Sequence, residues 1–259
     1  MRPLITLTTD FGEQDPYVAA MKGVIASRNP EAAVLDLTHA LPPQDIRAAA
    51  VFLESAAPYF PARTVHVAVI DPGVGASRHP IAVRAADSSF VCPDNGLLTL
   101  VLEHMPLTEA RIITNPACMR ATVSPTFHGR DIFAPTAAFL AAGNSLSETG
   151  PVLDALCTLD LPEPAWVSEH TLRGAVIHVD HFGTLVTNIR RTHLEGKTIA
   201  EIRVGPIVLD TICSTFSDVP AGSPAALFGS SGRLEIAVNC GHAARQYGLE
   251  RDAAIEIKV

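Results

Sequence analysis

The segment at residues 64–78, TVHVAVIDPGVGASR, constrains the fold more than any other stretch of the chain. Val65, Val67, Val69 and Ile70 make it a short apolar run rich in β-branched side chains, which predicts a strand buried on both faces. We expect the strand to end at Asp71, because residues 72–75 (Pro-Gly-Val-Gly) impose a tight loop. In an open α/β sheet, loops that leave the carboxyl ends of strands line the ligand crevice. The Asp71 carboxylate is therefore expected at a ligand site, with Arg78 close enough to keep it ionised. Turn chemistry alone remains an alternative explanation of Asp71.

Predicted strands and helices alternate along the first 160 residues. Strands are predicted at residues 4–9, 33–37, 65–70, 80–84 and 89–92, and helices at 17–27, 45–56 and 97–104, with a further helix after residue 131 that ends at Gly143-Asn144. The strands at 80–84 and 89–92 are expected to pair antiparallel. This alternation indicates an N-terminal α/β domain, residues 1–160, around a central, mostly parallel sheet.

The pattern changes beyond residue 160. Residues 161–171 contain Pro162-Glu163-Pro164 and predict a linker. Short strands follow, predicted at residues 174–179, 183–189, 199–204, 206–209, 225–229, 233–238 and 254–259. Such strands, separated by Gly, Asn, Asp and Pro, are typical of a small all-β domain, and we expect a C-terminal β-barrel at residues 172–259.

Composition and charge exclude several classes of protein. Hydrophobic residues make up 47% of the chain and charged residues 18%, so a sizeable core is expected and disorder is not. The net charge of -8 argues against a general nucleic-acid binder and against a protein of anionic membrane surfaces. The N-terminus lacks a signal-peptide pattern, and no apolar run reaches membrane-spanning length. The five cysteines form no C-x-x-C pair, which favours reduced thiols in the cytoplasm.

Two further residues of the first domain, Asp10 and His128, are candidates for contacts with a ligand or with water. Asp10 follows the first predicted strand, where a carboxylate commonly binds ribose hydroxyls. Helix capping is its alternative role, but Asp15 before Pro16 is the better cap, which leaves Asp10 available. His128 precedes a helix start, where the helix dipole favours a neutral ring that can accept a proton or a hydrogen bond from water. A loop histidine without a task is the alternative.

The remaining clusters are less specific. Arg130 and Asp131 are the right types for an ordinary ion pair at the helix start. Asp10, His39 and Asp71 could supply metal ligands, but no dense spacing such as His-Glu-x-x-His occurs, so no metal is expected.

Two loops of the second domain could contact a ligand, although each could be an ordinary hairpin turn. Asp180 and Phe182 would suit a sugar hydroxyl and a stacked base. The loop at residues 229–232, Gly-Ser-Ser-Gly, could bring backbone N–H groups to a ligand.

Seven motifs, in order along the whole chain, resemble one family. They read TTDFGEQDPYVAAMKG, DLTHALPPQDI, DPGVGASR, CPDNGLLT, TFHGRDIFAPTAA, VDHFGTLVTNI and GSSGRLEIAVN. The family is that of the S-adenosylmethionine hydrolases, also called SAM hydroxide adenosyltransferases, which are related to fluorinases and chlorinases. The resemblance implies an N-terminal α/β domain, a C-terminal β-barrel, no cofactor, and a homotrimer with active sites between subunits.

The resemblance also implies a reaction: attack of water or hydroxide on C5′ of the ribose, which gives adenosine and L-methionine. By similarity, Asp71, Arg78 and His128 are the catalytic set. The halogenating relatives have an aromatic residue in place of Asp71 and lack the histidine, which favours water as the nucleophile. A halide-using adenosyl transferase and a non-catalytic protein that binds SAM or adenosine remain the alternatives.

The substrate contacts implied by the resemblance are Asp10, Asp15, Asn95, Phe127, Asp180, Phe182, Thr184, Ser230, Glu235 and Val238. Asp10 is expected on the ribose hydroxyls, with Thr38, His39 and Phe127 as candidate walls. The second-domain residues are expected around the methionine and the adenine. The family commonly has asparagine where this chain has Thr184, whose hydroxyl can both donate and accept.

Overall fold

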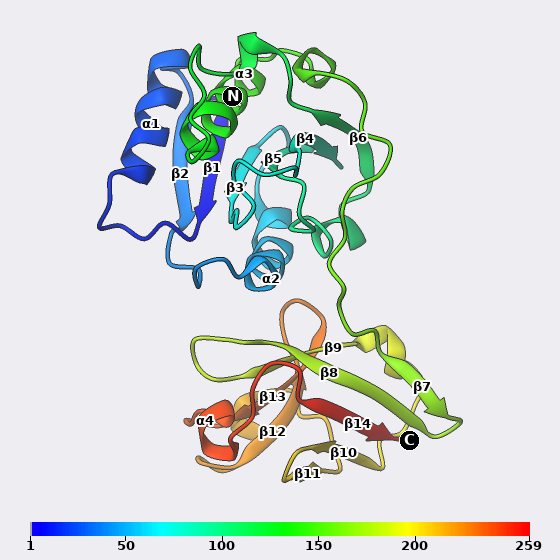
Figure 1. Cartoon of the computed structure of the whole chain (residues 1–259). Helices are drawn as coiled ribbons and strands as arrows, with labels where there is room; N and C mark the ends of the chain where they lie inside the picture. Colours follow the sequence, from blue (N-terminus) through cyan, green and yellow to red (C-terminus); the bar gives the residue numbers. More distant parts are fainter. Residues whose placement is uncertain (1) are drawn as a thin grey trace. The chain divides into compact units, whose positions relative to one another are not determined.

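The computed structural model describes residues 2–259, and the chain divides into two units, Met1–Leu159 and Asp160–Val259 (Figure 1). The strands of unit 1 are β1 (Leu4–Thr9), β2 (Ala33–Thr38), β3 (Val65–Val69), β4 (Pro80–Ala85), β5 (Ser88–Pro93) and β6 (Leu107–Ile112). Its helices are α1 (Tyr17–Arg28), α2 (Ile46–Ala56) and α3 (Ala134–Ala141), with short helical turns η1 (Ala57–Tyr59), η2 (Val101–Glu103), η3 (Pro116–Cys118), η4 (Gly129–Phe133) and η5 (Leu146–Thr149). No helix within residues 2–259 has both the length and the apolar character needed to cross a bilayer.

The sheet of unit 1 is mixed, in the order β2-β1-β3-β5-β4-β6. The pairs β2–β1, β1–β3 and β3–β5 are parallel, whereas β4 pairs antiparallel with β5 and with β6. The expected hairpin of β4 and β5 is confirmed, and its turn contains Ala86 at φ 45°. The expectation of a mostly parallel sheet is only partly right, because the hairpin and β6 make one half of the sheet antiparallel.

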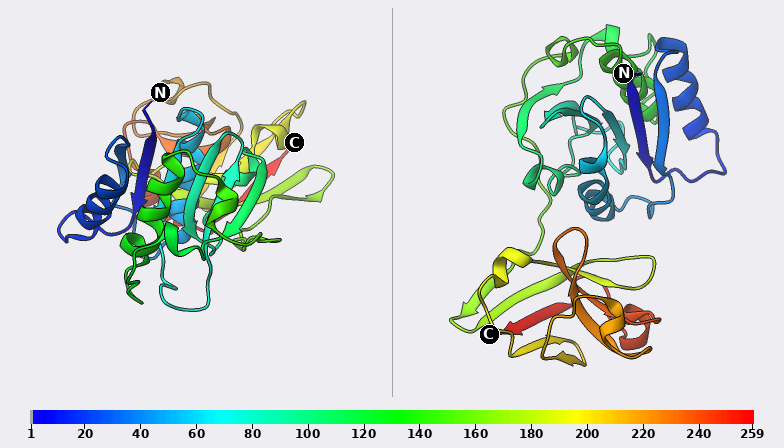
Figure 2. Two further views of the ribbon diagram at one scale, coloured as in Figure 1. Left: turned by 90° about the horizontal axis from the view of Figure 1, so that it is seen from above. Right: turned by 180° about the vertical axis from the view of Figure 1, so that it is seen from behind.

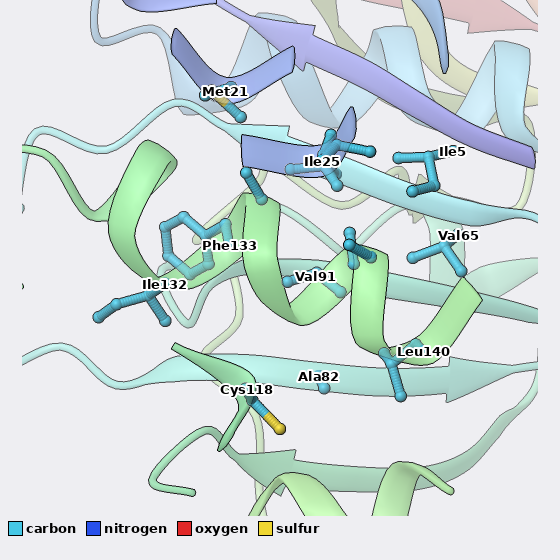
Figure 3. Packing of buried hydrophobic residues seen from close by; sticks show 14 of the residues in the cluster. Ile5, Met21, Ile25, Val65, Ala82, Val91, Cys118, Ile132, Phe133 and Leu140 are labelled. Atoms are coloured by element: carbon cyan, nitrogen blue, oxygen red, sulfur yellow. The ribbon is translucent and has the colours of Figure 1, made fainter. Parts of the chain in front are cut away.

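Helices cover both faces of this sheet. On one face, Met21 of α1 and Phe133 lie in one apolar cluster with Ile5 and Val65 of the sheet, as Figure 3 shows. On the other face, Leu53 of α2 belongs to a second apolar cluster. Every residue of β3 is buried, which confirms the prediction from its β-branched run. The views in Figure 2 also show α1 beside α3.

The predicted helix at residues 97–104 is wrong. The segment forms turns and the short η2, held by bonds such as Thr99 N–H to the Gly96 carbonyl (3.0 Å). Leu97, Leu98 and Val101 are all buried, so packing against the sheet sets this backbone path more strongly than helical periodicity does.

Unit 2 is an antiparallel β structure. Its strands are β7 (Ala165–Ser168), β8 (Thr171–Val179), β9 (Leu185–Arg190), β10 (Glu201–Val204), β11 (Ile207–Leu209), β12 (Pro224–Phe228), β13 (Arg233–Val238) and β14 (Ala254–Lys258). Its helical segments are η6 (Arg191–Leu194), η7 (Phe216–Asp218) and α4 (Ala243–Tyr247).

The sheet of unit 2 has the order β11-β10-β14-β8-β9-β13-β12, and β7 pairs with β8. A bridge between Cys213, after β11, and Leu227 of β12 brings the two ends of this path together, so the sheet is nearly closed and barrel-like. β7 occupies part of the segment that was expected to be a linker, because residues 165–168 pair with the start of β8.

Candidate active site

Asp71 and Arg78 form a bidentate ion pair just after β3. Arg78 Nε donates to Asp71 Oδ1 at 2.9 Å, and Arg78 Nη2 donates to Asp71 Oδ2. The two side chains are 5% and 9% exposed, respectively, so the pair is largely shielded from water. A planar guanidinium fork matches a carboxylate in this geometry. The Nη1 atom of Arg78 is buried and has no partner among residues 2–259, which leaves its N–H donors for a ligand or a water molecule.

His128 completes this set through Arg78. The Nη2 atom of Arg78 lies 2.7 Å from His128 Nδ1. A guanidinium can only donate, so Nδ1 accepts and the proton of the neutral ring sits on Nε2. Burial, and then the charge of Arg78, lower the pKa of His128 below its ordinary value. The lowered pKa agrees with the neutral ring expected from the sequence. The geometry differs from the expectation that the ring accepts from water, because the acceptor nitrogen Nδ1 already accepts from Arg78.

The loops that carry Asp71 and His128 touch each other. Gly75 has φ +76°, and a Cβ there would lie 2.3 Å from the Pro125 carbonyl oxygen. Only glycine fits such a close approach at this backbone angle. The ring of Phe133 lies 5.5 Å from the Arg78 guanidinium carbon, a cation–π contact from the neighbouring turn η4.

Asn95 supports Asp71 from the turn that follows β5. Its Nδ2 donates to the Ile70 carbonyl at 2.9 Å, and its Oδ1 accepts from Leu97 N–H at 3.3 Å. Ile70 directly precedes Asp71. The side chain of Asn95 thus fixes the point where the chain leaves β3.

A buried carboxylate organises the segment before His128. Asp131 is fully buried and accepts from Arg120 Nη1 (2.9 Å), Arg130 Nε (2.7 Å) and Ser124 N–H (2.8 Å). Burial acts to raise the pKa of Asp131, but the bonds from Arg130, Ser124 and Arg120 outweigh it and lower that pKa to about 2. The expected pair of Arg130 and Asp131 is confirmed, whereas no local pattern pointed to Arg120.

Asp10 has a structural partner, contrary to expectation. Its Oδ2 accepts from the backbone N–H of Gln44 at 2.7 Å, because Gln44 adopts a left-handed conformation with φ 66°. The expected cap of α1 is also wrong: Pro16 is the N-cap residue, without a side-chain cap bond, and Asp15 is exposed.

Phe127 connects the Asp10 loop to the His128 loop. Its ring packs edge-on against Tyr17 (5.3 Å between centroids) and Phe11 (6.1 Å). Two other candidate wall residues serve the fold. The His39 side chain is 4% exposed, with Nδ1 2.8 Å from Thr9 Oγ1 and Nε2 3.1 Å from Asp36. Thr38 Oγ1 accepts from Ala40 N–H.

Unit 2 brings a second group of the expected residues together. Asp180 Oδ1 accepts from Thr184 N–H at 2.7 Å. The Glu235 carboxylate packs on Gly229, where a Cβ would lie 1.8 Å from Oε1. Burial, and then the charge of Asp180, raise the pKa of Glu235 to about 6. Asp180, Thr184, Glu235 and the loop that carries Ser230 therefore form one cluster.

The other expected residues of unit 2 lie in contrasting environments. Phe182 is 74% exposed, whereas the Val238 side chain lies in the apolar core. His242 was not foreseen. Its ring fills the space beside Gly183, where a Cβ would lie 1.9 Å from His242 Nδ1. The glycine in Asp-His-Phe-Gly was the one sequence signal that something packs there.

Potential metal-ligand atoms gather at another place. Within residues 2–259, the three-residue group with ligand atoms inside 4.8 Å of one another is Glu54, Glu103 and His104. It shares no residue with the Asp71 set.

These features define a two-unit protein in which a mixed α/β unit holds a partly buried Asp–Arg–His set and an antiparallel unit holds an acidic cluster. The chain belongs to the SAM hydroxide adenosyltransferase family. The family's N-terminal domain matches residues 5–150, and its C-terminal domain matches residues 174–256.

Named relatives cover nearly the whole chain. The chain is 40% identical to the (R)-S-adenosyl-L-methionine hydrolase of Thermus thermophilus, over 99% of this chain and 100% of that one. It is 42% identical to the protein of the same name from Salinispora arenicola (93% and 92%). It is 30% identical to a fluorinase of Nocardia brasiliensis (100% and 97%). An uncharacterised conserved protein from Thermotoga maritima has a similar structure, with TM-score 0.89, 37% identity and coverage of 98% and 100%.

Proposed function

We propose that this chain hydrolyses S-adenosyl-L-methionine to adenosine and L-methionine. The observation that carries the proposal is the partly buried set of Asp71, Arg78 and His128, joined by one guanidinium group. Relatives at about 40% identity bear the name of this activity.

The chemistry suits such a set. The leaving group is a sulfonium, so it departs as a neutral thioether and needs no general acid. Water is a weak nucleophile, so orientation and proton removal carry the catalysis. Holding water in line with the C5′–S bond can contribute about 7–11 kcal/mol in favourable cases.

Each residue then has a distinct role. An ionised carboxylate offers about four lone-pair sites, and Arg78 occupies two on Asp71, so two remain to accept from a water molecule. The Nε2–H of His128 donates to that water and turns its other lone pair towards C5′. As the C–O bond forms, the C5′–S electron pair moves to sulfur. The released proton passes to Asp71 and then to solvent.

The substrate contacts extend this proposal. We assign Asp10 to the ribose hydroxyls, with Asp15, Asn95 and Phe127 near the pocket. Asp180, Phe182, Thr184, Ser230, Glu235 and Val238 are assigned to the methionine and adenine ends. Asn95 would act mainly by holding Ile70. Val238 would act through its backbone, since its side chain is buried.

The domain boundary near residue 160 and the expected homotrimer, with active sites between subunits, belong to the same proposal. Sedimentation equilibrium of the purified protein tests the trimer, and a monomer would contradict it.

Product analysis in labelled water tests the reaction. The protein is incubated with S-adenosylmethionine in H₂¹⁸O, without halide, and the products are separated by liquid chromatography and mass spectrometry. Adenosine that carries ¹⁸O, together with methionine, is expected. Formation of 5′-halo-adenosine when chloride or fluoride is added would favour a halide-using enzyme. Binding of intact substrate without turnover would favour a binding protein.

A further inference from the structure

A cavity of about 410 Å³ lies in unit 1, at the edge of the sheet opposite Asp71. Leu4, Ala33 and Val65 line it, and these are the first residues of β1, β2 and β3. Asp10 and Asp71 follow the other ends of β1 and β3. A strand of five to six residues spans about 17–20 Å, so a ligand in this cavity would not touch the Asp71 set.

The cavity concentrates positive charge in an acidic protein. Arg2, Arg63 and Arg84 line it, and no aspartate or glutamate does, although the whole chain has a net charge of -8. Arg2 donates to the backbone carbonyl of Glu31 at 2.8 Å. The structure gives the guanidinium groups of Arg63 and Arg84 no hydrogen bond or ion pair within residues 2–259. Positive groups that line one cavity repel each other, and an anion bound among them offsets that repulsion.

The backbone holds Arg63 at this edge in an unusual conformation. Arg63 has φ 69°, which is uncommon for a residue other than glycine, and its N–H donates to the Asp87 carbonyl at 2.7 Å. Such conformations gather at ligand sites, where the surrounding structure maintains them.

The other walls point to the kind of anion. Pro61, Ala62 and Leu140 give the cavity an apolar part. Its volume lies within the range of about 300–1,000 Å³ that is typical of small-molecule sites. An inorganic ion would leave most of this space unused, whereas a small molecule with an anionic group and an apolar body would use both kinds of wall.

We propose that this cavity is a second binding site, which takes a small organic anion and holds its carboxylate or phosphate group between Arg63 and Arg84. Both headgroups accept paired hydrogen bonds from arginine. The site is separate from the proposed reaction centre, and its occupant need not be a substrate.

Three probes that share an aromatic body separate the possible headgroups. Phenyl phosphate, phenylacetate and benzyl alcohol are titrated into the purified full-length protein by isothermal titration calorimetry. Saturable binding of phenyl phosphate or phenylacetate is expected, and the tighter of the two identifies the headgroup class. Benzyl alcohol is expected not to bind. Absence of saturable binding by both anions would overturn the proposal, as would equal binding of the alcohol.

Two variants locate the site. The double variant Arg63→Gln, Arg84→Gln is expected to raise the Kd of the bound anion at least tenfold. Ala62→Trp keeps all three arginines and fills the cavity from an exposed position, so it is expected to weaken binding as well. The matched control is Arg173→Gln, Arg203→Gln, which removes the same charge from exposed ion pairs in unit 2 and should bind as the unaltered protein does.

Unchanged binding in both cavity variants would overturn the assignment. Thermal unfolding and turnover of S-adenosylmethionine report whether each variant is folded, so failure here and failure of the proposed hydrolysis are distinguishable.

Discussion

Arg78 Nη2 lies 2.7 Å from His128 Nδ1, and the same nitrogen also donates to Asp71. One guanidinium group thereby fixes the orientation of a carboxylate and the tautomer of an imidazole. The site presents to a ligand the free lone pairs of Asp71, the Nε2–H of His128 and the Nη1 donors of Arg78.

Substitutions at His128 can distinguish the roles of its two ring nitrogens. The amide nitrogen of glutamine reaches about as far as Nε2 of histidine, whereas the amide of asparagine reaches only about as far as Nδ1. If the donor at Nε2 orients water, the kcat of His128→Gln should be about tenfold or more above that of His128→Asn. Single-turnover rates with S-adenosylmethionine measure this difference. Equal losses in the two variants would contradict the role of the Nε2–H.

Asp71→Asn preserves shape but removes the charge and one acceptor oxygen. We expect kcat to fall about 100-fold or more, within the range of lost general base catalysis, with a smaller change in KM. Arg78 would remain buried without its counter-charge, so the free energy of unfolding should also fall, by about 3 kcal/mol. Asp87→Asn, in the exposed turn between β4 and β5, is the matched control, and wild-type kcat in Asp71→Asn would refute the assignment.

Glu235 predicts a pH dependence of substrate binding. Its pKa is raised to about 6, so it is ionised above that pH and neutral below it. S-adenosylmethionine carries a sulfonium and an ammonium, which an ionised Glu235 attracts. We therefore expect KM to rise several-fold as the pH falls through about 6, while kcat changes little from this cause.

Steady-state kinetics between pH 5 and 8 test this dependence. Glu235→Gln should have a high KM that no longer varies around pH 6. Glu256→Gln, at a partly exposed residue paired with Arg173, should behave as the unaltered protein. A KM profile that is the same with and without Glu235 would contradict its contact with substrate.

His66 predicts an acid-sensitive stability of unit 1. Its ring stacks on Phe90 (4.9 Å between centroids) and its Nδ1 lies 2.8 Å from Thr6 Oγ1, while Nε2 has no partner among the described residues. Burial lowers the pKa of His66 from 6.5 to about 4. His66 therefore becomes protonated near pH 6.5 in the unfolded chain, but only near pH 4 in the folded chain. Stability should fall by roughly 3 kcal/mol across this window.

Urea unfolding at several pH values measures this loss. His66→Phe should be less sensitive to pH between 6.5 and 4, because the folded and unfolded states then differ by one titrating group fewer. His170→Phe, at an exposed site, is the control. An unchanged pH slope in His66→Phe would show that other groups cause the acid sensitivity.

Asp131→Asn should weaken the segment that carries His128. The variant leaves Arg120 and Arg130 without their shared carboxylate. We expect a loss of about 2 kcal/mol in unfolding free energy at pH 7, in keeping with a pKa lowered from 3.8 to about 2. Because that pKa is lowered, the stabilisation is present above pH 3.8 and is lost as the pH falls towards 2.

The control for Asp131 is Asp218→Asn. Asp218 likewise accepts from backbone N–H groups, those of Ser214 and Thr215, but lies at the surface. Urea unfolding at pH 7 and at pH 3 compares the two variants. Equal, small effects would mean that Asp131 contributes little to this segment.

Local sequence patterns predicted the elements whose apolar run and flanking turn residues indicate the same strand boundaries. The β-branched run of β3 and the tight loop after it placed Asp71 correctly at a strand end. The strand β13 has the predicted bounds. β6 was missed because its alternation of polar and apolar residues is weak in Leu-Thr-Glu-Ala-Arg-Ile, and β7 was missed because prolines precede it.

The details of the site depend on contacts between distant residues, which local patterns do not report. The family resemblance implied that Asp71, Arg78 and His128 share one centre, but the side of the His128 ring that faces Arg78 follows only from three-dimensional packing. The bond from Gln44 to Asp10 likewise needs a left-handed turn 34 residues away. The hydrogen bond from Arg120 to Asp131 joins two segments that no shared sequence pattern connects.

The contact between Gly75 and Pro125 also limits how the length of this chain can vary. An inserted residue in either loop would separate the two backbones and move Asp71 away from His128. Insertions should therefore be tolerated in exposed turns such as that around Asp87, but not in these two loops. Replacing the loop at Gly75 with that of a relative should preserve the site only when the loop at Pro125 is replaced as well.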